Sequence, residues 1–260
     1  MLEIFVRYLD EIGITGIDVM INPEYLAITV PPGRNQIDIP PGRTFSSERV
    51  IELVAHEIRT HLLRSHMQSK NTAGKGLGLL QRAPFSSRVE EGVAIHHELL
   101  VDGMKDLFSV TLKVLAVDEA AGGNTPRFIF EKMCRYYLLW NLLGRKPDSA
   151  QVEAKKQAFT LLKRILRGTS GQTPGAFFGK DATYKTGLDT VRAYLKDGGD
   201  FDDLFLGKVD VEHIPVYKGG LGFTQPPESR RPVHDVEAFR TQVMRIIEEV
   251  KHDTPPQEGS

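Results

Sequence analysis

The fold prediction rests first on residues 49–69, RVIELVAHEIRTHLLRSHMQS. Its apolar side chains recur at the spacings of three and four that are typical of an amphipathic helix: Ile51, Val54, Ile58 and Leu62. Ser46 or Ser47, with Glu48 in the first turn, is suited to begin such a helix. We therefore expect a long helix here, with one face in the core.

This helix carries the motif HEIRTH, residues 56–61. In the zinc-protease signature two His residues lie four positions apart on one helical face, and the intervening Glu takes a proton from metal-bound water. Here His56 and His61 are five positions apart, which separates them by about 140° on a regular α-helix. A π-bulge, with hydrogen bonds from i to i+5, brings such residues to the same side. We predict a local helix distortion between them, with Glu57 as the base.

The alternative is that these residues lie on a solvent-facing helix surface among other charged side chains. A third ligand from elsewhere favours the metal site, and the next predicted helix begins with EEGVA, residues 90–94. Ser87 and Glu90 form a capping box that occupies Glu90, so Glu91 is the better candidate to meet a metal. Gly92 costs about 1 kcal/mol inside a helix, which is understandable if another backbone approaches it. The alternative here is that both acids are solvated at a helix N-terminus.

The remaining sequence predicts an α+β fold that is mostly helical. Residues 1–12 form a short amphipathic helix in this interpretation, and three segments have strand composition: 16–21, 25–30 and 35–39. Further helices are expected over residues 88–102, 104–119, 126–143, 149–166, 185–197 and 235–251. A small N-terminal β-sheet therefore precedes the metal-bearing helix, as in a zincin-like metallopeptidase. We expect one catalytic domain over 1–252 and a disordered tail over 253–260.

Composition excludes several classes of partner. The 260 residues include 33 Lys and Arg against 34 Asp and Glu, so no net field attracts nucleic acid. The longest apolar stretch, residues 136–143, is far shorter than the ~20 residues that cross a bilayer. The first twenty residues do not resemble a secretory signal, and the single cysteine, Cys134, allows no intramolecular disulfide. We therefore expect a cytoplasmic protein with no nucleic-acid or membrane partner; the sequence does not indicate its oligomeric state.

Three blocks of this sequence, in order, resemble a known family. HEIRTH and EEGVA are followed by RILRG at residues 164–168 and FGKDATYKTG at residues 178–187. This series is similar to the family named for a QEGLA motif, which includes the microtubule-associated tyrosine carboxypeptidases and bacterial relatives. The chain departs from that motif at Glu90 and Val93, which leaves the position of Glu91 unchanged.

The resemblance implies roles for individual residues. It makes His56, His61 and Glu91 ligands of Zn²⁺ and Glu57 the catalytic acid and base. Four downstream residues then become candidates for substrate binding and catalysis: Arg164, Arg167, Lys180 and Tyr184. The basic side chains suit a substrate carboxylate, and the Tyr184 hydroxyl suits an oxyanion. The alternatives are a solvated helix face for the two Arg residues and a surface pair between Lys180 and Asp181.

We therefore expect a zinc metallopeptidase, specifically a carboxypeptidase that removes a C-terminal residue, such as tyrosine or another aromatic, from a peptide or protein. A zinc endopeptidase or amidase has the same machinery and is the alternative among enzymes. A binding module with a retained structural metal site is the alternative outside enzymes. A structural zinc takes four protein ligands, whereas the sequence offers three good candidates, which favours an enzyme.

Overall fold

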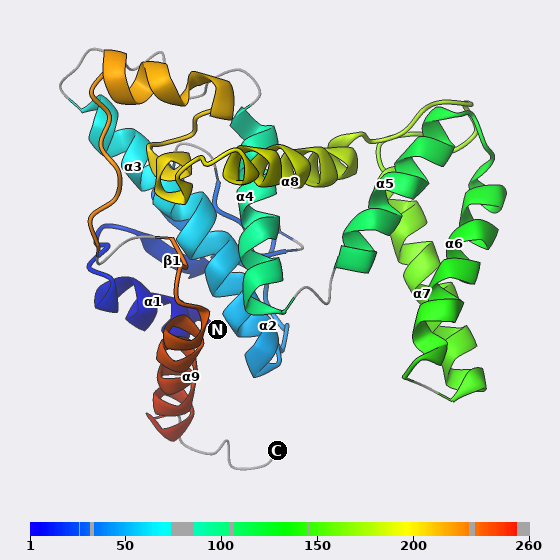
Figure 1. The fold of residues 1–260 in the computed structure, drawn as a ribbon. Coiled ribbons are helices and arrows are strands. Elements are labelled where there is room, and N and C mark those ends of the chain that lie inside the picture. Colours follow the sequence, from blue (N-terminus) through cyan, green and yellow to red (C-terminus); the bar gives the residue numbers. More distant parts are fainter. Residues whose placement is uncertain are drawn as a thin grey trace. The chain divides into compact units, whose positions relative to one another are not determined.

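The structure is a computed structural model that describes residues 1–25, 27–31, 34–73, 86–103, 107–144, 146–228 and 232–253. It divides the chain into two compact units. The first unit consists of Met1–Met104 and Gly187–Ser260, and the second consists of Lys105–Thr186. Figure 1 shows the elements of each unit in the order of the chain.

The first unit begins with a helix and a small sheet. Helix α1 (Leu2–Glu11) buries the apolar face that its sequence pattern predicts. Strand β1 (Asp18–Ile21) pairs in parallel with strand β2 (Gln36–Ile39), and Asp18 lies opposite Gln36. Strand β2 is the more buried of the two, so it forms the side of the sheet that joins the core.

The expected strand over residues 25–30 is wrong. In the described part of this segment, Thr29 makes only an isolated antiparallel bridge to Asp38. The bridge consists of two main-chain hydrogen bonds of 2.9 and 3.1 Å between Thr29 and Asp38. The pairing does not extend beyond Val30 because the next residue, Pro31, has no N–H to donate.

The stretch at 49–69 forms the long central helix of the first unit, as predicted. It consists of α2 (Ser47–Leu53), the π-helix η1 (Val54–Leu62) and α3 (Leu63–Thr72). Ser46 caps its start, because its hydroxyl accepts a hydrogen bond of 3.2 Å from the Arg49 N–H. The apolar positions of the predicted stripe are all at most 2% exposed. The helix therefore runs through the core.

The first unit contains several further elements. They are α4 (Ser86–Val101), the later part of α8 (Lys180–Lys196), η3 (Phe201–Phe205), η4 (Val211–His213), η5 (Val216–Gly220) and α9 (Val236–Asp253). One hydrophobic cluster joins side chains from α1, the central helix, α4 and α9. Helix α9 ends at Asp253, one residue inside the expected tail, and residues 254–260 lie outside the described residues.

A polar stripe on α3 holds the irregular segment that follows α8. Arg64 is fully buried and donates hydrogen bonds to the carbonyl oxygens of Gly207 and Val209, at 3.1 and 2.8 Å. Gln68 accepts a hydrogen bond from the Lys208 N–H at 2.9 Å. These side chains supply the main-chain partners that a segment without regular structure needs when it is buried.

In the described part of the second unit, every regular element is a helix. It contains α5 (Leu107–Ala121), α6 (Pro126–Leu142), α7 (Pro147–Ile165) and the beginning of α8. Thr125 caps α6 by accepting a hydrogen bond of 3.2 Å from the Phe128 N–H. The core of this unit is a separate hydrophobic cluster made by α5, α6 and α7. No helix among the described residues is long and apolar enough to span a membrane.

Candidate metal centre

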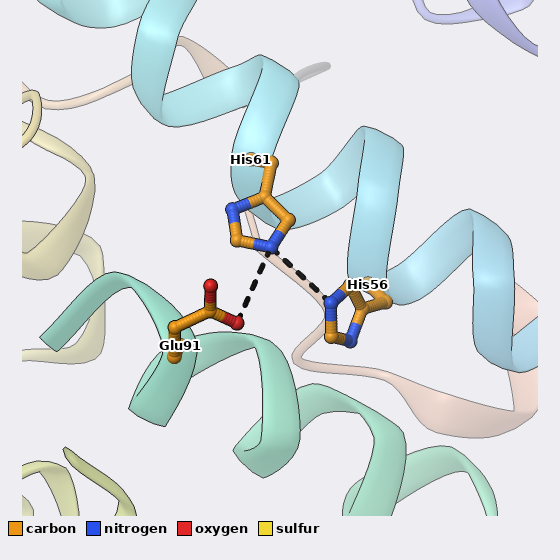
Figure 2. Close-up of side chains that lie close together, drawn as sticks. All are labelled: His56, His61 and Glu91. Atoms are coloured by element: carbon orange, nitrogen blue, oxygen red, sulfur yellow. Dashed lines mark hydrogen bonds and ion pairs between the residues drawn. The ribbon is translucent and has the colours of Figure 1, made fainter. Parts of the chain in front are cut away.

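The π-helix brings His56 and His61 together. Their Nε2 atoms lie 3.2 Å apart, and the two rings point toward one another (Figure 2). The predicted distortion is thus confirmed, although it is longer than a single bulge and covers the nine residues Val54–Leu62. Because its hydrogen bonds run from i to i+5, residues five apart share one side of the helix.

Glu91 reaches the same point from α4 (Figure 2). Its Oε2 lies 3.9 Å from His61 Nε2. Ligand atoms of Glu91, His56 and His61 all lie within 4.8 Å of one another. Among the described residues, this is the one group of His, Cys, Asp or Glu side chains placed to hold a metal ion.

The second nitrogen of each imidazole faces a carboxylate. His61 Nδ1 lies 3.0 Å from Glu90 Oε1, and His56 Nδ1 lies 3.3 Å from Glu98 Oε1. For His61 this contact is a hydrogen bond, which favours the tautomer with the proton on Nδ1 and leaves the Nε2 lone pair for a metal. Carboxylate partners of this kind orient metal-binding His residues in many proteins.

The spacing of the two Nε2 atoms fits a zinc-sized ion. At 3.2 Å the two nitrogens can share either a proton, in a hydrogen bond, or a metal ion. Zn–N bonds of about 2.0–2.1 Å at a tetrahedral angle place two nitrogen ligands about 3.3–3.4 Å apart. The donor set of two imidazoles and one carboxylate also matches the ligands that catalytic zinc takes.

The carboxylates around the site favour positive charge within it. Burial alone would lower the pKa of His56, but Glu98, with smaller effects from Glu57 and Glu91, raises it to about 9. Glu57 is 7% exposed, and burial raises its pKa, although His56 and His61 oppose that change. A carboxylate with a raised pKa is better suited to accept a proton near neutral pH.

The capping role expected for Glu90 is wrong. Ser87 lies inside α4, which begins at Ser86, so Ser87 is not the N-cap. Glu90 is instead buried, and its Oε1 contacts Lys208 Nζ at 2.8 Å as well as His61. Burial would raise the pKa of Glu90, but His61 and then Lys208 hold it far below its usual range. Glu90 therefore orients His61, a proposed ligand. Glu91 is left to join the ligand group because His61 and Lys208 engage Glu90, and not because a capping bond does.

Gly92, the next residue, allows α4 to reach this position. Its backbone lies against the backbone of Gly187 on α8, and a side chain at either residue would overlap the other helix. The close backbone approach predicted from the sequence is confirmed. It fixes the part of α4 that carries Glu90 and Glu91.

The four downstream candidates lie in the second unit. The Arg164 Nε donates a hydrogen bond of 2.6 Å to Asp181, whose side chain is fully buried, and the Arg164 guanidinium lies over the Tyr184 ring. The Arg167 guanidinium lies 3.8 Å from the Phe178 ring centroid. Lys180 is the first residue of α8. Asp181 thus pairs with Arg164, rather than with Lys180 as the surface-pair alternative supposed, and Arg164 is not simply a solvated residue.

Sequence reasoning missed Glu98 and Lys208 as neighbours of the proposed ligands. Glu98 lies two helical turns after Glu91, so the i, i+7 spacing of the two acids was a signal that both face the same neighbouring helix. No comparable signal marks Lys208, because it lies in a segment without periodicity and meets Glu90 only through the fold.

Two comparisons with known proteins bear on these observations. The family model described as microtubule-associated tyrosine carboxypeptidase matches residues 4–248, which is nearly the whole chain. No match was found among curated proteins. The family match covers the π-helix, the ligand group and both units. The chain therefore belongs to the microtubule-associated tyrosine carboxypeptidase family.

Proposed function

We propose that this protein is a zinc-dependent carboxypeptidase that removes a C-terminal residue, tyrosine or another aromatic, from a peptide or protein. Membership of the family implies a peptidase of the carboxypeptidase type. The observation that carries the zinc dependence is the convergence of the His56, His61 and Glu91 ligand atoms within 4.8 Å.

In this proposal the same three residues hold the metal through His56 Nε2, His61 Nε2 and a Glu91 carboxylate oxygen. Zinc held by these residues would lower the pKa of water and polarise the scissile carbonyl. Glu57 then takes a proton from the attacking water and gives it to the nitrogen of the leaving amino acid. The C–N bond breaks, and the products are a shortened chain with a new carboxylate and one free amino acid.

A carboxypeptidase must also recognise the free carboxylate of its substrate. Arg167 and Lys180 are our proposed partners, because their charges suit a carboxylate and their positions match the family's later motifs. Arg164 is a weaker candidate, since Asp181 already engages its guanidinium. The Tyr184 hydroxyl remains the proposed donor to the oxyanion.

The number of ligands bears on the alternative of a binding module. A structural zinc is enclosed by four protein ligands, whereas a catalytic zinc keeps one position for water or substrate. Within the part of the chain that the structure describes, the group that suits a metal has three members, His56, His61 and Glu91. This composition supports catalysis.

The experiment is a panel of paired peptides, each made with a free and an amidated C-terminus, that end in Tyr, Phe, Ala or Glu. Products are identified by mass spectrometry after incubation with zinc-loaded wild-type protein and with Glu57→Gln. We expect loss of one C-terminal residue from free peptides, at least tenfold slower cleavage of amidated ones, and little cleavage by Glu57→Gln. Cleavage at internal bonds irrespective of amidation indicates an endopeptidase. No cleavage of any peptide by zinc-loaded protein contradicts the proposal.

A further inference from the structure

The π-helix needs a tertiary explanation. Long π-helices are rare and occur mostly as single-turn bulges, so nine residues in this geometry require support from outside the helix. The site depends on this support, because a regular α-helix places His56 and His61 on different sides. The residues that hold the π-helix are therefore as important to the site as its ligands.

A side chain within the helix marks its register. The Thr60 hydroxyl donates a hydrogen bond of 3.0 Å to the carbonyl oxygen of Ala55, five residues earlier. In an ordinary α-helix, Ser and Thr hydroxyls bond to carbonyls three or four residues earlier. The hydrogen bond from Thr60 thus spans five residues, the spacing of a π-helix. Thr60 is also the residue immediately before His61 in the sequence.

A buried histidine on α4 holds that hydroxyl in place. His97 Nδ1 lies 2.7 Å from Thr60 Oγ1, and both residues are completely buried. The Thr60 proton is directed to the Ala55 carbonyl, which can only accept, so His97 Nδ1 must donate. The other ring nitrogen, Nε2, then accepts the Val233 N–H at 3.2 Å. Each donor in this chain of three bonds has one acceptor.

Aromatic packing fixes the His97 ring. Its centroid lies 5.2 Å from that of Phe201 and 5.6 Å from that of Phe205, both on η3. Burial also lowers the pKa of His97 well below its ordinary value, which favours the neutral ring that the chain of bonds requires. His97 therefore has one tautomer and one orientation.

We propose that Thr60 and His97 form a latch that holds the π-helix in register and thereby positions His56 and His61 to chelate one ion. The latch consists of the two side chains and their bonds to Ala55 and Val233. Neither residue belongs to the ligand group, so both act as positioning residues. The metal part of this inference rests on the proposed function, and the geometric part does not.

The first test compares zinc affinity, measured by competition with a chromophoric chelator, with the free energy of unfolding of the metal-free protein. Thr60→Val removes the hydroxyl and keeps the shape, and Thr60→Ser keeps the hydroxyl. We expect Thr60→Val to weaken zinc binding about 10- to 100-fold, as loss of other supporting residues does, and Thr60→Ser to restore most of the affinity. Thr72→Val is the matched control, because the Thr72 hydroxyl bonds to the Gln68 carbonyl four residues earlier in α3.

Variants of His97 repeat the comparison if Thr60→Val is too unstable to purify. His97→Asn places an amide donor near the former Nδ1, whereas His97→Phe fills the space without a donor. We expect His97→Asn to bind zinc more tightly than His97→Phe. Wild-type affinity in folded Thr60→Val and His97→Phe would overturn the proposal, since a merely structural role changes stability without changing affinity.

A crystal structure of metal-free Thr60→Val separates this inference from the proposed function. We expect the π-helix to shorten or become α-helical, and the two Nε2 atoms to move beyond 3.2 Å. If wild-type protein binds no zinc, the proposed function fails. The crystal structure of Thr60→Val then tests by itself whether the latch holds the π-helix. An unchanged π-helix in the variant would overturn it.

Discussion

A Cβ atom added to Gly92 would lie 2.2 Å from the carbonyl carbon of Gly187, and one added to Gly187 would lie 2.0 Å from the Arg88 carbonyl oxygen. Helices α4 and α8 therefore cross with their backbones in contact. Contacts this short cannot be relieved by a side-chain rotation, because the opposing atoms belong to the main chain. The crossing sets the position of Glu91, the residue before Gly92, relative to the helix that carries His56 and His61.

Substitution Gly92→Ala should accordingly destabilise the protein and weaken zinc binding together. Forcing a methyl group into a closely packed site costs about 1–3 kcal/mol or more, and the relief must move the part of α4 that carries Glu91. Urea unfolding and zinc titration measure the two effects. Gly219→Ala is the control, because its added Cβ meets no atom within 4 Å. Equal stability of Gly92→Ala and wild type would show that α4 and α8 do not approach so closely.

The zinc stoichiometry tests the ligand group directly. Purified wild-type protein should carry close to one equivalent of zinc, and both the double substitution of His56→Ala with His61→Ala and the single Glu91→Ala should lose it. Glu57→Gln should keep zinc and lose roughly 10² to 10⁴ in turnover, because a general base is removed while the ligands remain. Unchanged zinc in the double variant would move the metal site away from this helix.

The contact between His56 Nδ1 and Glu98 predicts a graded effect on metal affinity. Glu98→Gln should weaken zinc binding by about 10- to 100-fold without abolishing it, because the imidazole loses its orienting carboxylate but keeps Nε2. Glu52→Gln is the matched control, since Glu52 shares the Arg49 guanidinium with Glu98 and is not the carboxylate in contact with His56 Nδ1. A similar loss in both variants would assign the effect to Arg49 instead.

Acid should destabilise the metal-free protein partly through His97. Burial lowers the pKa of His97 in the folded state, whereas the unfolded residue has a pKa of about 6.5. Below that pH the unfolded chain binds a proton that the folded protein does not, so the free energy of unfolding falls as pH falls. Between pH 5.5 and 4.5, the free energy of unfolding should fall more steeply for wild type than for His97→Phe, by at most about 1.4 kcal/mol per pH unit, the value for one proton. Chemical denaturation in the presence of a chelator measures both slopes; identical slopes would mean that His97 is protonated in the fold.

His96, the residue before His97, also makes the free energy of unfolding depend on pH, but it does not change the comparison of wild type with His97→Phe. Burial, followed by the charge of Arg192, lowers the pKa of His96 to about 4, so it contributes a slope of the same sign. Because this contribution is present in both wild type and His97→Phe, it cancels in the difference between them.

Local sequence was sufficient for the elements that periodicity and capping define. The apolar spacing from Ile51 to Leu62 predicted the central helix, and its cap is Ser46, one of the two serines expected to begin it. The five-residue separation of His56 and His61 predicted the distortion of that helix, because two side chains expected to hold one ion must face the same point. Gly92 likewise indicated a close backbone approach, since glycine is costly inside a helix without such a reason.

Residues that meet only in three dimensions could not be predicted in the same way. Arg64 and Gln68 look like a solvated helix face in the sequence, yet they are buried and bind the main chain of residues 207–209. Glu90 fits a capping box in the sequence, but the fold places Lys208 and His61 around its carboxylate. A polar side chain does not reveal from sequence whether its partner is water or a distant backbone.

The residue types of the proposed site, and the departure of their helix from α-helical geometry, could be predicted because motif and spacing are local properties of the chain. The hydrogen bonds that hold this geometry are visible only in the folded protein. Thr60 and His97 are 37 residues apart in the sequence, and His97 and Val233 are 136 residues apart. Their hydrogen bonds form because folding removes water from all three groups at one place, and no pattern along the chain encodes that coincidence.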